Sequence, residues 1–337
     1  MDLEKLRKIL KERGEPDYRF WQIYQAVFKN LCFDFNKITN IPPKLREELK
    51  KEIRIFSLKL RELKKGKEVE KALFELKDGL LIETVLMRHK YGKKTVCVSC
   101  AVGCPLKCKF CATGKMGFKR NLSWQEIVDQ VLFFAKKEKD KKLNVVFMGM
   151  GEPFLNYDNV LGAIGVLNNK KGFNLAVRAI SISTAGIIPA IKKLAKEGLE
   201  VNLAISLNSP DNKQRSYLMP INKKYPLKEL IKAAKNYVKA TKRKLFFEYV
   251  MLKGVNDDLV SARKLAKLLK GETLFHLNLI RYNETEAGFE SSDRKTILNF
   301  QKELEKMGIK TTIRHSFGEE IEAACGQLIT QTKNKTN

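Results

Sequence analysis

Five of the seven cysteines lie within fifteen residues, in the segment CVSCAVGCPLKCKFC that runs from Cys97 to Cys111. Two sets of metal ligands fit this segment. Cys97, Cys100, Cys108 and Cys111 form two C-x2-C pairs, as in a zinc site, but only seven residues separate the pairs and Cys104 is left over. The other set is Cys104, Cys108 and Cys111. Three thiolates on a four-iron cluster leave one iron open, and an open iron can chelate a substrate.

The charge balance predicts a polyanionic partner. The chain has 65 Lys and Arg residues against 38 Asp and Glu residues, which gives a formal net charge of +27. Such an excess is typical of nucleic-acid binding, because cations that neutralise phosphates release counterions. The alternative is a lysine-rich surface that is merely solvated, as the mixed charges of residues 136–142 illustrate.

Neither a signal peptide nor a membrane segment is expected. The N-terminus is charged from Asp2 onward, and the chain has no run of eighteen apolar residues. We therefore expect a cytoplasmic protein without membrane contact. In that compartment cysteines bind metals or react more often than they form a disulfide scaffold.

Four segments must position these groups. Residues 1–65 carry apolar side chains at three- and four-residue spacing, which predicts a small helical accessory domain, and its basic surface suits RNA binding. Residues 66–94 predict a β-hairpin with a turn at 77–79. Residues 95–328 form the predicted core domain, and residues 329–337 are typical of a disordered tail.

The core segment alternates short β-rich runs with helical stretches, which predicts an α/β fold with a parallel sheet curled into a full or partial barrel. In such folds ligands bind at the carboxyl ends of the strands. Short polar residues and glycines follow the predicted strands, and each alone is more often a turn residue than a ligand. These residues are Gly149, Gly151, Glu152, Ser183, Ser206, Asn208 and Asn283.

The cysteine motif C-x3-C-x2-C follows a predicted strand and has Phe110 before its last cysteine. It resembles the cluster motif of the radical S-adenosylmethionine (SAM) superfamily. More narrowly, the chain is similar in the order and spacing of its motifs to the RNA adenine methyltransferases of the RlmN and Cfr type. The resemblance covers nearly the whole chain, through the segments VCVSCAVGCPLKCKFCATG, FMGMGEPFLNYDNV, ISISTAGIIP, LAISLNSP, LMPIN, NLIRYN and IEAACGQL. It implies a partial (β/α)6 barrel with a small helical N-terminal domain and a connecting β-hairpin.

The resemblance implies one [4Fe-4S] cluster on Cys104, Cys108 and Cys111, and two SAM molecules per turnover. Carbon 2 of adenine is too electron-poor to attack the methyl group of SAM. In the family, a cysteine therefore takes a methyl group from one SAM, and a 5′-deoxyadenosyl radical from a second SAM removes a hydrogen from that methyl group. The carbon radical then adds to the base. The resemblance places the methyl carrier at Cys325, and at Cys97 the cysteine that forms a disulfide with it as the product leaves.

The resemblance also assigns a proton acceptor and a set of SAM contacts. The proton acceptor falls on Glu83, which shares a predicted strand face with Leu81, Val85 and Met87; a buried carboxylate there suits proton transfer, and an exposed edge-strand position is the alternative. The implied SAM contacts are Gly151, Glu152, Ser183, Ser206, Leu207, Asn208 and Asn283.

Two positions depart from the family pattern. Asn208 stands where the family usually has a histidine, so its amide can hydrogen-bond SAM but a proton-transfer role is not expected there. Cys100 stands where serine is common, and we expect it to be structural.

Taken together, the motifs favour methylation of carbon 2 of an adenine in 23S rRNA, with a tRNA anticodon-loop adenine as a further substrate. Flavodoxin or ferredoxin is the expected electron donor, and a monomer is expected. The alternative within the family is Cfr-type methylation of carbon 8 of the same adenine, which confers antibiotic resistance. The alternative of another class is an RNA-binding protein with a structural iron–sulfur cluster, which would need neither Cys97 nor Cys325.

Overall fold

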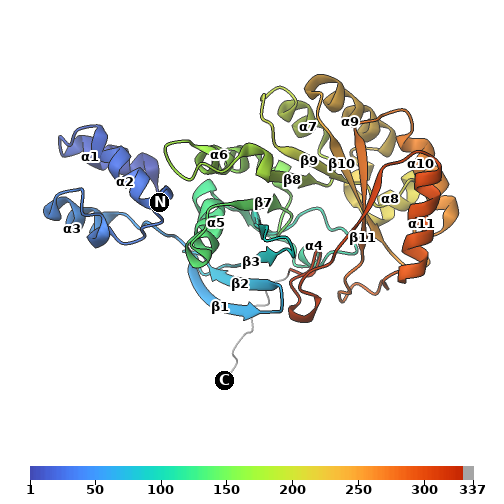
Figure 1. Cartoon of the computed structure of the whole chain (residues 1–337), viewed down its shortest axis with the longest axis horizontal. Coiled ribbons are helices and arrows are strands. Elements are labelled where there is room, and N and C mark those ends of the chain that lie inside the picture. Colours follow the sequence, from blue (N-terminus) through green and yellow to red (C-terminus); the bar gives the residue numbers. More distant parts are fainter. Residues whose placement is uncertain (329–337) are drawn as a thin grey trace.

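A ten-stranded sheet organises the computed structural model, which describes residues 1–328 (Figure 1). Its strand order is β1-β2-β3-β4-β7-β8-β9-β10-β11-β12. The first four strands are antiparallel to one another, and β4 and the strands after it are all parallel. The predicted tail, residues 329–337, lies outside the described residues.

The N-terminal segment is helical, as the spacing of its apolar residues predicts. Leu6, Ile23 and Leu49 are buried, one on each of its three helices, and hold the bundle together. Asp2 begins the first helix by accepting a hydrogen bond from the backbone N of Lys5 at 2.9 Å. The helices are α1 (Leu3–Glu12), α2 (Tyr18–Phe28) and α3 (Pro43–Glu52).

An antiparallel meander connects this bundle to the core. The predicted hairpin is confirmed as β2 (Val69–Glu75) and β3 (Leu81–Arg88), and β4 (Lys94–Cys97) pairs with β3. The prediction of a helical segment up to residue 65 is wrong at its end, because β1 (Lys59–Lys65) pairs with β2 there. This strand is almost entirely exposed, so it lacks the apolar alternation by which a strand is predicted.

The core is a partial barrel of six strand–helix units, β4–α5, β7–α6, β8–α7, β9–α9, β10–α10 and β11–α11, with β12 at the open edge. This confirms the predicted fold class. The further strands are β7 (Leu143–Phe147), β8 (Ile180–Thr184), β9 (Asn202–Ser206), β10 (Leu245–Met251), β11 (Phe275–Arg281) and β12 (Thr311–Arg314). The helices are α5 (Trp124–Glu138), α6 (Tyr157–Asn168), α7 (Ile188–Leu194), α8 (Asn212–Leu218), α9 (Leu227–Thr241), α10 (Leu259–Leu269) and α11 (Arg294–Lys306).

The cysteine loop leaves the barrel after β4. It is framed by β5 (Ala101–Gly103) and β6 (Phe118–Asn121), which pair with each other, and by the short helix α4 (Ala112–Lys115). Gly103 has a φ of +77°, and a Cβ there would lie 1.9 Å from the carbonyl oxygen of Gly117. Only glycine therefore allows this turn to close.

Apolar side chains from both faces of the parallel strands form the core. Phe147 and Phe247 are buried on β7 and β10, and Phe134 and Phe300 are buried on helices that cover the sheet. Among the helices of residues 1–328, none combines the length and the apolar character needed to cross a bilayer.

Candidate active site

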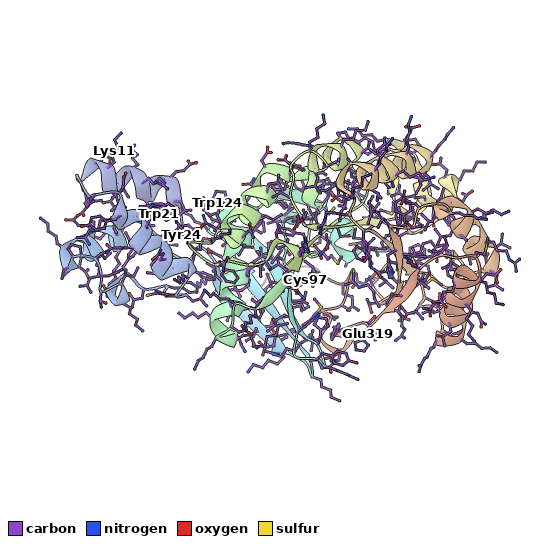
Figure 2. The ribbon with its side chains drawn as sticks, turned by 45° about the horizontal axis from the view of Figure 1, so that its top comes forward. Lys11, Trp21, Tyr24, Cys97, Trp124 and Glu319 are labelled. Atoms are coloured by element: carbon purple, nitrogen blue, oxygen red, sulfur yellow. The ribbon has the colours of Figure 1, made fainter. Side chains whose placement is uncertain are left out.

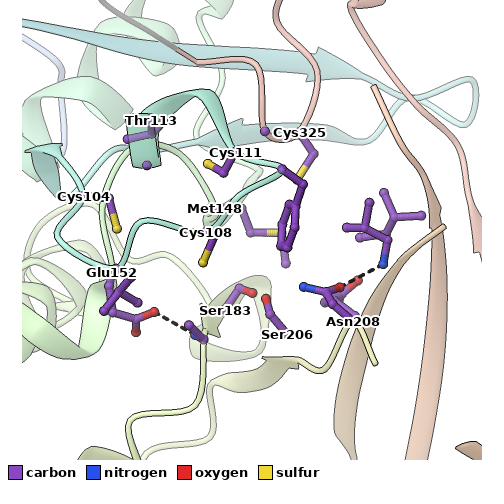
Figure 3. A pocket seen from close by; sticks show the side chains of 18 of the residues that line it. Cys104, Cys108, Cys111, Thr113, Met148, Glu152, Ser183, Ser206, Asn208 and Cys325 are labelled. Atoms are coloured by element: carbon purple, nitrogen blue, oxygen red, sulfur yellow. Dashed lines mark hydrogen bonds between the residues drawn. The ribbon is translucent and has the colours of Figure 1, made fainter. Parts of the chain in front are cut away.

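One cavity lies between the cysteine loop and the carboxyl ends of the parallel strands, where the sequence predicts the site. Figure 3 shows cysteine, serine, glutamate and asparagine side chains around it, from segments far apart in the chain. We call it the first cavity. Its predicted site residues are Cys104, Cys108, Cys111, Gly151, Glu152, Ser183, Ser206, Asn208, Asn283 and Cys325.

The three cysteines of the predicted cluster line this cavity together. Burial raises the pKa of Cys104 to about 12 and also raises the pKa of Cys108 and of Cys111. A metal therefore has to displace protons to bind here. Within residues 1–328 no three His, Cys, Asp or Glu side chains converge on a single ion. A four-iron cluster needs no such convergence, because each thiolate binds a different iron, so the trio fits a cluster.

The other two cysteines of the segment lie elsewhere. The Sγ of Cys100 is buried 3.6 Å from the carbonyl oxygen of Met150. Cys97 is opposite Val85 in the sheet and lines a different cavity. The four-cysteine zinc set is therefore dispersed, and Cys100 has the structural surroundings that were expected.

Hydrogen bonds join the loop that carries Cys325 to the cysteine loop. The backbone N of Ala112 donates to the carbonyl oxygen of Gly326 at 2.8 Å, and the Oγ1 of Thr113 donates to the carbonyl oxygen of Leu328 at 2.6 Å. Both donors lie on α4, directly after Cys111. These bonds hold Cys325 at the edge of the first cavity, about two hundred residues from the cysteines in sequence.

Glu152 is held in place by hydrogen bonds on both of its carboxylate oxygens. Its Oε1 accepts from the Oγ1 of Thr184 at 2.6 Å and from the backbone N of Phe154 at 3.1 Å, and its Oε2 accepts from the backbone N of Ala185 at 2.7 Å. Burial raises the pKa of this carboxyl group, against the effect of these bonds. A fixed carboxylate facing the cavity suits the ammonium of an amino acid.

Two asparagines complete the predicted contacts. Asn208 has a left-handed backbone, with φ of +57°, and its Oδ1 accepts from the backbone N of Val250 at 2.9 Å. Asn283 donates through Nδ2 to the carbonyl oxygen of Cys325 at 3.1 Å. The Oδ1 of Asn283 is buried without a hydrogen-bond partner in the described part of the chain. A ligand donor in the cavity would satisfy this acceptor.

Leu207 does not line the cavity, although the resemblance places it among the SAM contacts. Its side chain is buried in the apolar core, and its backbone N donates to the carbonyl oxygen of Glu248 at 2.9 Å. Its own carbonyl oxygen accepts from the Nε of Arg215 at 3.0 Å. The residue therefore supports the ends of the strands rather than touching the cavity.

Arg215 is an important residue that the sequence reasoning missed. It is fully buried, and beyond Leu207 its guanidinium donates to the carbonyl oxygens of Ala185 and Ser206 and to the Oδ1 of Asn222, at 2.8–2.9 Å. Burial lowers its pKa to about 10, while the nearby Cys108 acts in the opposite direction. An arginine in a polar stretch is normally exposed, so the sequence carries no signal for this role.

A second cavity adjoins the first and contains Cys97. Cys325 lines both cavities, as do Met148 and Asn283. Figure 2 shows Cys97 near the middle of the molecule, away from the labelled residues of the N-terminal helices. Burial raises the pKa of Cys97 to about 12. Cys325 is exposed to the cavities, and the protein around it raises its pKa to about 11; the positive charge of Arg314 acts against both shifts. All seven cysteines are free, so the disulfide that the resemblance implies is not present here.

Glu83 is buried, which excludes the exposed alternative. Its Oε1 lies 2.9 Å from the Nζ of Lys71, and that ammonium also donates to the carbonyl oxygen of Glu322 at 2.9 Å. Glu83 lines neither cavity, but it is two residues from Val85, which lines the second. The lysine thus connects Glu83 to the loop that carries Cys325.

Comparison with known proteins agrees with this geometry. Residues 98–266 match the family model of the radical SAM superfamily, and residues 1–55 match that of the ribosomal RNA large subunit methyltransferase N-terminal domain. A probable dual-specificity RNA methyltransferase RlmN of Dictyoglomus thermophilum is 45% identical over 97% of this chain and 94% of its own length. The chain belongs to the RlmN family of radical SAM methyltransferases. A second RlmN, from Geobacillus kaustophilus, is 44% identical over 97% of this chain and 91% of its own length.

A solved structure extends the RlmN-family match to three dimensions. The crystal structure of a radical SAM methyltransferase from Sphaerobacter thermophilus superimposes with a TM-score of 0.93 and 42% identity, over 97% of each chain. The helical bundle, meander and barrel of this chain are therefore the shared architecture of the two proteins.

Proposed function

We propose that this protein transfers a methyl group from SAM to carbon 2 of an adenine in 23S rRNA, with a tRNA adenine as a further substrate. The observation that carries the proposal is the position of Cys325. Its side chain opens to the first cavity, with Cys104, Cys108 and Cys111, and to the second cavity, with Cys97. One thiol thus lies between a cofactor site and a second thiol.

The first cavity suits SAM and a [4Fe-4S] cluster on the three cysteines. When bound, the cluster supplies the electron that cleaves the sulfonium bond of SAM. The fixed carboxylate of Glu152 binds the SAM ammonium, and Ser183 and Ser206 face the cavity where they can hydrogen-bond the ribose. The unpaired Oδ1 of Asn283 accepts from the amino group of adenine.

Cys325 is proposed as the methyl carrier. Its thiolate attacks the methyl group of SAM, forming a carbon–sulfur bond and releasing S-adenosylhomocysteine. The positive charge of Arg314 favours that thiolate. Cys97 shares the second cavity with Cys325, which suits the release of the product through a disulfide between the two.

Glu83 is proposed to accept the proton that leaves the base. The ammonium of Lys71 joins it to the backbone of Glu322, three residues before Cys325. This link holds the buried carboxylate beside the loop of Cys325. Like the choice of carbon 2, the assignment depends on the family motifs.

The proposed partners follow from the charge and the substrate. RNA matches the net charge of +27, and an acidic electron carrier such as flavodoxin or ferredoxin suits the same surface. The protein is proposed to act as a monomer in the cytoplasm, where ribosomal RNA is found.

The test is mass spectrometry of nucleosides from a 23S rRNA fragment incubated with reconstituted protein, SAM and a reductant. The expected product is 2-methyladenosine; 8-methyladenosine would support the Cfr-type alternative instead. Cys325→Ala should yield neither product, whereas Cys32→Ala, which changes a half-buried cysteine of the N-terminal domain, should remain active. RNA binding without any methylated adenosine would favour the alternative of a structural cluster.

A further inference from the structure

The second cavity extends far beyond Cys97 and Cys325. It has a volume of about 800 Å³ and runs through the barrel interior to the amino ends of the strands. A barrel interior is normally filled by branched apolar side chains. Here five strands instead contribute small polar residues near their amino ends, namely Thr95, Asn144, Ser181, Asn202 and Thr312. An open interior with polar side chains at its amino end and apolar walls further in indicates a binding channel rather than a packed core.

Tyr91 lies at the mouth of this channel and is 95% exposed. It sits on the turn between β3 and β4, where the backbone N of His89 donates to the carbonyl oxygen of Lys93 at 2.8 Å and the backbone N of Gly92 donates to that of His89 at 2.9 Å. The His89 ring also lies 2.9 Å from the Oγ1 of Thr95. The turn therefore holds Tyr91 in a defined place without covering its ring.

A second contact braces the turn from the other side of the mouth. The rings of His89 and His315 both meet Phe317 edge-on, with centroids 4.9 Å and 4.8 Å away. Phe317 belongs to the segment between β12 and Cys325. The turn, the far edge of the sheet and the loop of Cys325 thus meet at this mouth.

The charge at the mouth is mainly positive. Lys90 and Lys93 are exposed on the turn of Tyr91, and Lys93 lines the cavity. Two arginines of the lining are already paired, Arg178 with Glu200 at 3.0 Å and Arg314 with Glu248 at 3.4 Å. Glu68 brings one acidic group near the mouth, 3.9 Å from the Nε2 of His315. Exposed lysines beside an exposed aromatic ring match a polymer that has both phosphates and bases.

We propose that the target nucleotide of the RNA enters through this mouth, from the amino end of the barrel, and that Tyr91 stacks on the base next to it. Lys90 and Lys93 bind the phosphates on either side. Single-stranded RNA is commonly held in this way, by aromatic stacking and by contacts to its backbone. The channel leads the unstacked adenine to Cys97 and Cys325, while SAM occupies the first cavity on the opposite side of Cys325. This inference rests on the proposed function.

The test uses an RNA hairpin that contains the target adenine, with 2-aminopurine replacing each neighbouring nucleotide in turn. Stacking on Tyr91 should quench the fluorescence of one probe when the wild-type protein binds. Tyr91→Ala should abolish that quenching and weaken binding about tenfold, whereas Tyr91→Phe should behave as the wild type because it keeps the ring. In the methylation assay, Tyr91→Ala should raise the KM for RNA about tenfold and leave kcat nearly unchanged.

Matched controls test RNA binding at the mouth separately from methyl transfer. Lys93→Ala should weaken RNA binding several-fold, whereas Lys267→Ala, on α10, should not. Tyr91 is exposed, so its variants should keep the thermal stability of the wild type. If the wild type methylates the hairpin and Tyr91→Ala binds and methylates it equally well, the inference is wrong while the proposed function stands. If the wild type binds but produces no methylated adenosine, the proposed function fails instead.

Discussion

At the residue scale, reactivity depends on how a protonated thiol becomes a nucleophile. The side chain of Cys325 is exposed to the cavities, yet the protein around it displaces enough water to raise its pKa to about 11, so at neutral pH the thiol is mostly protonated. The charge of Arg314 opposes this shift, and its guanidinium also pairs with Glu248. A cation placed near both Cys325 and Cys97 favours the thiolate form of each.

Replacing Arg314 tests this dependence. In Arg314→Met the pKa of Cys325 should rise further, since the charge that lowers it is gone. Its thiolate fraction should fall, and alkylation by iodoacetamide should become several-fold slower at pH 8. Mass spectrometry of the Cys325 peptide between pH 7 and 10 measures the rate, and Arg314→Lys should restore most of it. An unchanged pH profile in Arg314→Met would show that the charge of Arg314 does not affect the pKa of Cys325.

A second prediction at this scale concerns the charge of the Glu152 carboxylate, which we expect to strengthen SAM binding. Glu152→Gln keeps the shape of the side chain but removes its charge, so binding of SAM should weaken at least tenfold, as expected for the loss of a charge-assisted hydrogen bond. Equilibrium dialysis of the reconstituted protein measures the affinity. Glu303→Gln, which changes a half-buried residue of α11 outside the cavity lining, provides the control. Equal affinities in the two variants would show that Glu152 does not contact SAM.

Sequence reasoning found the reactive residues unevenly. Cysteine spacing narrowed the metal ligands to two overlapping sets, and the resemblance favoured Cys104, Cys108 and Cys111. Cys325 and Cys97 were assigned only by resemblance, since no local feature distinguishes a reactive cysteine from a packed one. The resemblance also placed Leu207 in the site, yet its side chain lies in the core, while its neighbours Ser206 and Asn208 line the cavity.

At the scale of elements, the ends of β8 and β9 are held by one side chain from α8. Arg215 donates to the carbonyl oxygens of Ala185, Ser206 and Leu207, which follow or end these strands. The same strand ends carry the polar groups that face the first cavity. Arg215 therefore positions cavity residues without lining the cavity itself.

Replacing Arg215 should cost stability as well as affinity for SAM. Arg215→Met leaves several buried carbonyl oxygens without donors, so the free energy of unfolding should fall by about 2–5 kcal/mol. Urea denaturation measures this change. Arg263→Met removes an exposed arginine that pairs with Glu303, and it should change stability by less than about 1 kcal/mol. A similarly small effect in Arg215→Met would contradict the positioning role.

Helices and strands could be predicted where their apolar residues recur at the regular spacing of a helix or a strand. Amphipathic helices such as α9 and buried strands such as β10 follow directly from their apolar spacing. β1 escaped prediction because its partner, β2, stabilises it through backbone hydrogen bonds while its side chains stay in water. Nothing in a charged, exposed heptapeptide distinguishes such a strand from the end of a helix.

At the scale of the whole molecule, the net charge of +27 predicts how RNA affinity depends on salt. Each phosphate neutralised by a lysine or arginine releases counterions, so the affinity should fall more than tenfold between roughly 50 and 200 mM salt. Filter binding of the RNA hairpin at several salt concentrations measures the slope. A flat response would mean that the basic surface does not contact phosphates.

The alternation of strands and helices predicted the overall architecture. It did not predict the contacts between distant segments that bring the site residues together. The bond from Thr113 to the carbonyl oxygen of Leu328 joins residues 215 positions apart. Lys71 likewise connects the meander with the C-terminal loop. It pairs with Glu83 within the meander and donates to the carbonyl oxygen of Glu322 in the loop. Such contacts depend on the folded topology, so no local pattern predicts them.

The central claim is that three thiolates hold a cluster whose open iron binds SAM beside Cys325. Anaerobically reconstituted protein should contain about four irons per chain, and it should form 5′-deoxyadenosine when SAM and dithionite are added. Replacing Cys104, Cys108 and Cys111 with alanine should abolish both signals. A tetrahedral zinc ion in the cysteine loop, with no iron and no 5′-deoxyadenosine from the intact protein, would contradict the account.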